Sequence, residues 1–257
     1  MNRNDLLKNK PANLYLILSA FFIGNALIAE LTGVKIFSLV ELLNMNSEPE
    51  SGLGVDMSVG VLLWPLVFIL SDLLNEYFGK AGVRKISFIT AGLIAYTSVF
   101  LFIGTGLPPA EFWLENNAAD TSGNPFNIDY AYNVVFRQGI NIIIGSVLAF
   151  LVSQLIDAYA FHYIRKVTGH KMLWVRATGS TVISQVIDSF LILTVAFYLL
   201  GNWSFKQVLE VALVQYIYKV SIAIILTPLI YVIHYFADRY LGKETSAEIV
   251  EKADHNW

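Results

Sequence analysis

Six long runs of apolar residues, separated by short polar or charged segments, dominate the sequence. A helix rises about 1.5 Å per residue, so roughly 20 apolar residues cross a hydrocarbon core about 30 Å thick. The runs therefore predict an all-α, polytopic membrane protein with six transmembrane helices. We expect one membrane domain, residues 1–240, and a charged tail, residues 241–257, that is partly helical or disordered. The expected spans are residues 13–31, 58–78, 86–106, 139–164, 173–200 and 209–236.

Composition supports a membrane protein and excludes several kinds of site. Of the 257 residues, 56% are hydrophobic and 14% are charged, which is too apolar for a soluble domain of this length. The chain has no cysteine, which excludes disulfides and thiolate metal sites. Its four histidines show no HxxxH or HExxH spacing, so neither a metal site nor a cofactor is expected.

Lysine and arginine are unevenly distributed between the two sets of connecting segments. The N-terminus, the connections at residues 79–85 and 165–172, and the tail carry most of them, whereas the opposite side carries mainly acids. By the positive-inside rule both termini should lie in the cytoplasm, which agrees with an even number of spans. The other side should hold a polar turn, residues 45–56, and an ordered external loop, residues 107–132.

The second span carries two acids on one helix face. Asp72 and Glu76 are four residues apart, and Glu76 either belongs to a site or forms an interfacial pair with Arg84. A carboxylate at the bilayer centre costs about 2.5–3.5 kcal/mol on insertion scales, so such residues usually line a cavity or pathway. Pro65 lacks a backbone donor and is expected to kink the helix. A kinked, acid-bearing span indicates a protein that moves a polar solute.

A short motif recurs in the fourth and fifth spans, as Ser153-Gln154-Leu155-Ile156-Asp157 and Ser184-Gln185-Val186-Ile187-Asp188. In each copy Gln and Asp share a helix face and need polar partners inside the membrane. Chance is the alternative explanation, because Ser and Ile are common in membrane helices. A looser copy, Ser71-Asp72-Leu73-Leu74-Asn75, is compatible with a three-plus-three inverted repeat, since a three-helix unit reverses its topology.

Depth counting pairs Asp188 with Lys219, because both lie midway along consecutive antiparallel spans. Such a pair either holds the bundle together or takes part in binding substrate or protons. Arg176 opens the fifth span, and its position favours a snorkelling topology anchor. Asn25 is expected to form either an interhelical hydrogen bond or a solute contact. Trp64, Tyr77 and Tyr216 could stack on a flat ligand or simply pack in the core or against lipid.

Carboxylates accept hydrogen bonds, and amides both donate and accept them. Several such groups beside aromatic rings suit a flat heterocycle rich in N–H donors, such as a guanine-like base. They suit a cation or protons equally well.

In these motifs the chain resembles the queuosine precursor transporters of the vitamin-uptake transporter family. The resemblance covers most of the membrane region, and residues 111–129 and the tail lie outside it. It implies import of 7-deazaguanine precursors, such as 7-cyano-7-deazaguanine, across the bacterial inner membrane for synthesis of the tRNA base queuosine. The matching positions are residues 60–65, Asp72, Glu76, Tyr77, Gly79, Arg84, the two Ser-Gln-x-x-Asp copies with their intervening Ile156, Trp174, Arg176, Ser180, Thr181, Ser189, Phe190, Lys219 and Pro228.

The resemblance and the residues together predict a secondary or facilitative transporter, with proton coupling through a buried acid as an option. Its partners would be a deazapurine and the lipid bilayer, a homodimer is compatible, and no direct contact with nucleic acid is expected. The expected substrate-binding residues are Asn25, Asp72, Glu76, Gln154, Asp157, Gln185, Asp188 and Lys219, with stacking by Trp64, Tyr77 or Tyr216.

Two other functions were weighed against this one. The chain could be the substrate-binding membrane subunit of an energy-coupling-factor vitamin importer, in which case a partner ATPase supplies the energy, because no Walker-type glycine loop is present. An intramembrane enzyme with paired acids is disfavoured, since the sequence has no GxGD or nucleophile motif.

Overall fold

The computed structural model describes residues 9–42, 56–137, 139–169 and 172–255. The expected polar turn at residues 45–56 lies outside them except for Asp56, and so do the basic residues Arg3, Lys8 and Lys171. The described chain is mostly helical, as predicted, with one short antiparallel strand pair that the all-α prediction missed. The elements are α2 (Lys10–Thr32), β1 (Ile36–Ser38), α3 (Leu39–Leu42), β2 (Asp56–Ser58), α4 (Trp64–Gly104), α5 (Glu111–Asn116), α6 (Ile128–Phe136), α7 (Ile140–Thr168), α8 (Leu173–Leu193), α9 (Phe205–Leu241) and α10 (Lys243–His255).

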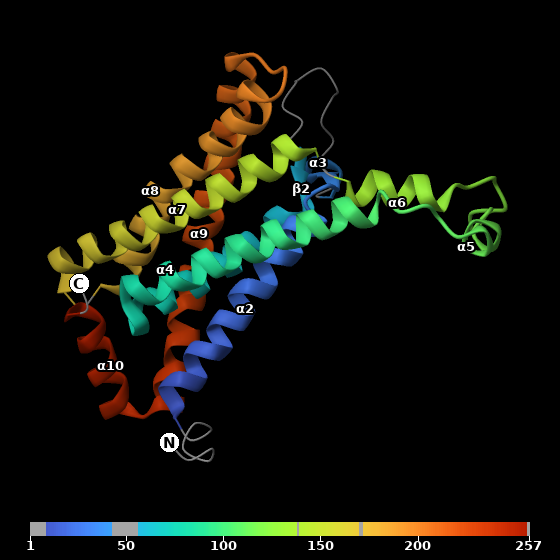
Figure 1. Cartoon of the computed structure of the whole chain (residues 1–257). Helices are drawn as coiled ribbons and strands as arrows, with labels where there is room; N and C mark the ends of the chain where they lie inside the picture. Colours follow the sequence, from blue (N-terminus) through green and yellow to red (C-terminus); the bar gives the residue numbers. More distant parts are fainter. Residues whose placement is uncertain (1–8, 43–55, 138, 170–171, 256–257) are drawn as a thin grey trace.

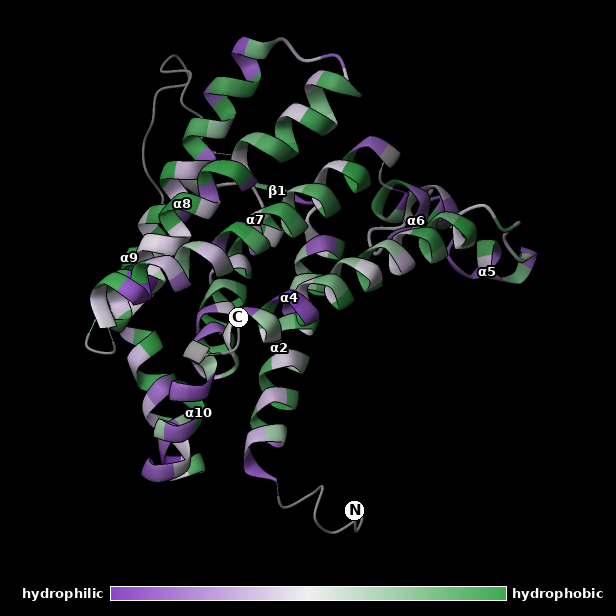
Figure 2. Ribbon diagram, turned by 60° about the vertical axis from the view of Figure 1, so that its left-hand side comes forward, coloured by the Kyte–Doolittle hydropathy of each residue, from purple (hydrophilic) through white to green (hydrophobic). Residues whose placement is uncertain are grey.

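Five helical stretches of the described chain are long and apolar enough to cross a membrane. In Figure 2 these stretches are mainly green, whereas α10 is mainly purple. The expected count of six spans differs because residues 58–78 and 86–106 fall mostly within one helical stretch, α4. The five stretches are Lys10–Thr32, Trp64–Gly104, Ile128–Thr168, Leu173–Leu199 and Phe205–Leu241.

The long helix α4 folds back on itself at Gly79. This residue has φ +66° and ψ −178°, which is outside the helical region. The middle of α4 lies beside the start of α2, where the Tyr15 hydroxyl donates to the Gly82 carbonyl at 3.1 Å. The turn that precedes α4 and the last turns of α4 both lie beside the other end of α2, because Gly60 approaches the backbone of Ala29 and the last turns of α4 line a cavity with Leu27 and Leu31. The reversal therefore takes place at a single residue, without the loop that the sequence predicted.

Pro65 starts a helix and does not kink one. The chain enters α4 through a 3-10 turn, Val59–Leu62, that is capped by the Ser58 hydroxyl, and Pro65 lies in the first turn of α4. A proline in a first helical turn removes no helical hydrogen bond, because the N–H groups there have no partner within the helix. The expected kink at this position is therefore wrong.

The tail folds onto the bundle as the helix α10. It leaves α9 at Gly242, where φ is +89°, and in Figure 1 it crosses toward the junction of α7 and α8. The Ser246 hydroxyl donates to Asp238 of α9, and Ile249 and Val250 pack against the main apolar core. The start of α2 lies at this same end of the bundle, since the Lys10 ammonium is 5.8 Å from the Tyr240 ring. We call this end of the bundle the α10 end and the other the β1–β2 end.

The segment expected to be an ordered loop, residues 107–132, contains α5 and the start of α6, and Figure 1 shows it extending away from the bundle. Its turn is organised by Asp120, whose carboxylate accepts the backbone N–H groups of Asn124 and Ser122 at 2.9 and 2.8 Å. Hydrogen bonds from Asn124 and Ser122 hold the pKa of the Asp120 carboxyl below its usual value. Trp113 packs edge-on against Tyr132 of α6, with the ring centroids 6.4 Å apart.

We expect Gly79→Ala to lower the thermal midpoint of the detergent-solubilised protein. Its backbone conformation is accessible almost only to glycine, and forcing another residue into it costs about 1–3 kcal/mol. An added Cβ would also lie 2.8 Å from the Ala253 carbonyl oxygen of α10. The matched control is Gly92→Ala in the same helix, where an added Cβ meets nothing within 4 Å. Equal midpoints for the two variants would contradict the proposed role of Gly79.

Candidate functional site

A band of buried polar side chains runs through the apolar bundle along α4, α7, α8 and α9. Groups of this kind are costly in the membrane unless they are paired or line a cavity. The band includes most of the residues that the sequence singled out and others that it did not. Its members are Ser71, Asp72, Asn75, Glu76, Ser153, Gln154, Asp157, Arg165, Arg176, Ser180, Thr181, Ser184, Gln185, Asp188, Ser189 and Lys219.

The two Ser-Gln-x-x-Asp copies face each other across the contact between α7 and α8. The Ser153 hydroxyl donates to Asp188 Oδ1 at 3.2 Å, and the Ser184 hydroxyl donates to Asp157 Oδ1 at 3.1 Å. The serine of each copy thus serves the aspartate of the other. This reciprocity requires antiparallel helices, so the recurrence in the sequence has a structural role in joining α7 to α8.

The predicted pair of Asp188 and Lys219 is confirmed as an ion pair. The Lys219 ammonium donates to Asp188 Oδ2 at 2.6 Å, and the two side chains are 8% and 14% exposed. Asp188 therefore links three helices, because it also accepts from Ser153. Its charge is balanced within the band, as a buried carboxylate requires.

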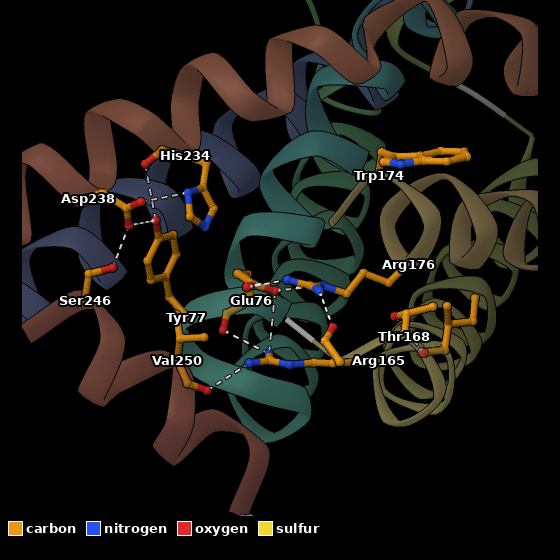
Figure 3. Close-up of polar contacts among 12 residues, drawn as sticks. Glu76, Tyr77, Arg165, Thr168, Trp174, Arg176, His234, Asp238, Ser246 and Val250 are labelled. Atoms are coloured by element: carbon orange, nitrogen blue, oxygen red, sulfur yellow. Dashed lines mark hydrogen bonds and ion pairs between the residues drawn. The ribbon is translucent and has the colours of Figure 1, made fainter. Parts of the chain in front are cut away.

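At the α10 end, Glu76 is held by two arginines (Figure 3). The Arg176 guanidinium binds its carboxylate through two hydrogen bonds, Nη2 to Oε1 at 2.6 Å and Nε to Oε2 at 3.0 Å. Arg165 Nη1 lies 3.6 Å from Oε2 and donates to the Glu76 backbone carbonyl at 3.2 Å. The other Arg165 terminal nitrogen donates to the Val250 carbonyl of α10 at 2.9 Å. One carboxylate thus connects α4, α7 and α8, and Arg165 adds α10.

One expectation about these charges is wrong, and one open alternative is decided. Arg176 was expected to snorkel to the interface, but it is 1% exposed and bonds inward, to Glu76 and to the Gly169 carbonyl at 2.8 Å. Of the two alternatives for Glu76, the interfacial pair with Arg84 is not formed, because Arg84 is exposed and Glu76 binds Arg176. Arg165 was not predicted as a site residue, although it follows Asp157 by eight residues, with Phe161 midway, so that all three share one face of α7.

The layer between the two ion-paired ends is less fully paired. Gln154 accepts from the Ser71 hydroxyl at 2.9 Å. Buried polar atoms without a hydrogen-bond partner among the described residues include Asp72 Oδ1, both amide atoms of Asn75 and of Gln185, and Ser189 Oγ. Asn75 appeared in the sequence only as part of the looser motif copy. Unpaired buried polar groups each cost about 1–3 kcal/mol, so this layer is the part of the band with unmet hydrogen-bonding capacity.

Asp72 also lines a groove between α4, α8 and α9, with a volume of about 240 Å³. The opposite wall is built from small or apolar residues, among them Ala177, Thr181 and Ala223. Neither Asp72 nor Asp157 forms an ion pair with a described residue. Among the described members of the band, four carboxylates therefore face three cations. The four are Asp72, Glu76, Asp157 and Asp188, and the three are Arg165, Arg176 and Lys219.

Four of the expected residues lie apart from this layer. Asn25 donates to the Phe21 carbonyl of its own helix at 2.7 Å. Trp64 packs on Phe68 and Phe150, and Tyr216 is half-buried on α9. The Tyr77 hydroxyl donates to Asp238 at 2.7 Å, so this ring ties α4 to α9. Among the described residues no group of three or more His, Asp or Glu side chains could hold a metal ion.

We expect Glu76→Gln to destabilise the protein strongly, because it leaves two buried guanidinium groups without their carboxylate. Breaking a buried pair from one side costs about 3–5 kcal/mol. The measurement is the thermal midpoint and the yield of folded protein in detergent. The control is Glu210→Gln, which breaks an exposed ion pair with Lys206 and should cost at most about 1 kcal/mol.

A Glu76→Gln/Arg176→Gln double variant should recover part of the loss, because it removes one uncompensated charge together with its former partner. If Glu76→Gln melted like the wild type, the pair could not hold this end of the bundle together.

Comparison with known proteins supports the resemblance seen in the sequence. Residues 58–233 match the family described as "Putative vitamin uptake transporter". A "Probable queuosine precursor transporter" of Bacillus subtilis (strain 168) is 29% identical over 180 residues, 69% of this chain and 72% of the relative. The "Queuosine precursor transporter" of Escherichia coli (strain K12) is 27% identical over 187 residues, 69% and 72% of the two chains. No solved structure matches. The family match covers more than half of the chain and contains the whole buried polar band, and the chain therefore belongs to the vitamin uptake transporter family.

Proposed function

We propose that the protein imports a queuosine precursor, a 7-deazapurine such as 7-cyano-7-deazaguanine, across the bacterial inner membrane. The names of the Bacillus subtilis and Escherichia coli relatives support a transporter for this class of solute. The observation that carries the proposal is the layer around Asp72, where carboxylate and amide atoms are buried without partners beside a groove. Uptake of the labelled base by cells that cannot make it, read out as restored tRNA modification, tests the assignment directly.

Six membrane crossings follow if the two halves of α4 each cross once. The reversal at Gly79 would then lie on the same side as both chain ends. We place this α10 end in the cytoplasm, since it carries Lys80, Lys85 and Arg239. The three-plus-three inverted repeat and the homodimer remain predictions within this proposal.

The unpaired atoms suit the chemistry of a deazapurine. A guanine-type edge presents parallel N–H groups, which a carboxylate such as Asp72 accepts through two charge-assisted hydrogen bonds. Gln185 and Asn75 can each donate and accept at the remaining edges of the base. A solute without these groups would leave buried atoms unpaired, and that penalty gives the site its selectivity.

The excess carboxylate supplies a route to proton coupling. A buried carboxylate without a cation is strongly disfavoured, so we propose that Asp72 and Asp157 share one proton in the absence of substrate. Binding of N–H donors would stabilise both charges and release that proton. The base and the proton would then move in opposite directions across the membrane, so a lower pH on the outside would oppose import of the base.

We expect Asp72→Asn and Asp157→Asn each to reduce uptake of the labelled base by about tenfold or more, because each removes a charge-assisted acceptor worth about 1.5–3 kcal/mol. The protein should still fold, since neither residue takes part in an ion pair. Glu210→Gln, on an exposed stretch of α9, is the matched control. Wild-type uptake in both band variants would refute this assignment of the site.

Reconstitution separates this mechanism from the energy-coupling alternative. A secondary or facilitative carrier moves the base in liposomes that contain this chain alone. A substrate-binding subunit requires a partner ATPase, which would co-purify with it from membranes.

The structure suits a state that is closed at the cytoplasmic end. The groove is shallow, and its volume of about 240 Å³ includes space open to its surroundings, so we propose that α4, α8 and α9 separate to admit a base. Below the groove, the Glu76 cluster and α10 block the path toward the α10 end. We propose that release into the cytoplasm requires α10 to leave Arg165.

A chain that ends at Leu241 should therefore leak. From proteoliposomes loaded with base we expect efflux to rise about tenfold, which corresponds to about 1.4 kcal/mol of lost closure. Ser246→Ala, which removes the bond to Asp238, should give a smaller rise in the full-length chain. The control is Glu248→Gln, which loses only an exposed pair with Lys252. Unchanged efflux in both variants would show that α10 is not part of the gate.

A further inference from the structure

The connection between α4 and α7 forms an arm, residues 107–136, whose main helix is α6. In Figure 1 the arm leaves the β1–β2 end beside the last turns of α4 and reaches sideways, beyond the bundle. One side of α6 is packed within the arm, because Trp113 of α5 lies edge-on against Tyr132, and the Tyr132 and Phe136 ring centroids lie 4.8 Å apart. The opposite side of α6 is exposed.

The exposed side chains of α6 are apolar and its polar ones are half-buried. Tyr130, Val134 and Val135 are exposed, and the first two are four residues apart on one helix face. Asp129 and Asn133 are half-buried, and the Asn133 amide donates to the Asp129 carbonyl at 2.8 Å. A helix that faces water presents its polar residues to the solvent, so this pattern is reversed. The exposed face of α6 therefore suits an apolar environment.

This face adjoins a helix that is long and apolar enough to cross a membrane. Val99, Phe100 and Ile103, in the last turns of α4, are exposed and would face lipid there. The Arg137 guanidinium carbon lies 5.0 Å from the centre of the Phe102 ring, which holds the end of α6 against these turns. Because a membrane-crossing helix ends near the headgroups, the arm begins at that depth, where its apolar face can continue the lipid-facing surface of α4.

The charges of the arm favour one kind of lipid surface. The arm contains no lysine or arginine. Its charged residues are Glu111, Glu115, Asp120 and Asp129. Helices that bind anionic lipids carry basic residues on their polar face, so an acidic arm suits zwitterionic headgroups instead. Its cluster of Trp113 and Tyr132 agrees with this depth, because Trp and Tyr are enriched at the level of the headgroups.

We propose that the arm lies flat in the headgroup layer of a zwitterionic phospholipid bilayer, with the exposed face of α6 toward the acyl chains. Tyr130 and Val134 would then be removed from water, whereas the turn at Asp120 would stay in it. The arm would anchor the connection between α4 and α7 to the lipid at the β1–β2 end. This inference goes beyond the proposed function, because it holds for any solute that the bundle carries.

The absence of cysteine from the chain allows a depth measurement with single spin labels. The label is attached to Val134→Cys, in phosphatidylcholine nanodiscs that each hold one full-length chain. Its collision rates with oxygen, which concentrates among acyl chains, and with a water-soluble nickel chelate report its depth. We expect a depth of about 5–10 Å into the boundary of headgroups and acyl chains, as for other interfacial helices. The references are Val99→Cys on α4, which should collide mainly with oxygen, and Glu248→Cys on α10, which should collide mainly with nickel.

A second label position tests whether the apolar face holds the arm in place. With the label at Tyr130→Cys, adding Val134→Asp should move the label into water, because the new charge lies on the buried face. Adding Thr121→Asp, which places the same charge in the exposed turn, should leave the depth unchanged.

Two results would overturn the inference. If the label at Val134→Cys collided with nickel as often as the label at Glu248→Cys, the arm would lie in water. If two chains in one nanodisc showed strong coupling between their labels at Val134→Cys, a second copy would cover this face. The solute takes no part in these measurements, so they are independent of the transport proposal.

Discussion

The Glu76 carboxylate is buried in an apolar bundle, and two guanidinium groups neutralise it. Charges of this kind are stable only when the geometry is good and the remaining donors are satisfied. Here the two-pronged contact with Arg176 meets the first condition, and the carbonyls of Gly169 and Val250 meet the second. Because these partners come from α4, α7, α8, α10 and the connection before α8, this one interaction fixes the relative positions of all of them. It also closes one end of the bundle.

The rest of the buried polar band contains carboxylates that the Glu76 cluster does not neutralise. Glu76 takes both arginines and Asp188 takes Lys219, so the layer between them has acids and amides but no cation of its own. Ser184 of α8 holds Asp157, and Asp72 on α4 lies close enough to Asp157 to interact with it electrostatically. A fully paired layer at this depth would only hold the helices together. In a layer with unpaired acceptors, the cost of burying them without partners is removed when a solute with N–H donors binds, and this favours binding.

Much of the helical architecture could be predicted from the sequence, because apolar length and charge asymmetry are local properties. The Asp188–Lys219 pair could be predicted too, since depth can be counted along two consecutive helices. Arg176 could not, because a basic residue at a helix end resembles a snorkelling anchor until a partner such as Glu76, 100 residues earlier, is known to lie beside it. The reversal at Gly79 could not be predicted either. A positive φ favours glycine, but glycine also adopts helical φ values, so its presence in the sequence does not indicate which conformation occurs.

The helix α10 contacts one of the two arginines that bind Glu76. Val250 lies outside residues 58–233, the part that matches the family, yet its carbonyl accepts from Arg165, which lies inside that part. Without α10, the Arg165 donor would face water, and a guanidinium that water can reach is a weaker closure than one bonded to a packed helix. Gly79 is also involved, because α10 passes so close to it that a side chain there would meet Ala253. The reversal of α4, the second arginine and the tail helix therefore pack together at one end of the bundle, and in the proposed mechanism a segment outside the family match sets how firmly that end is closed.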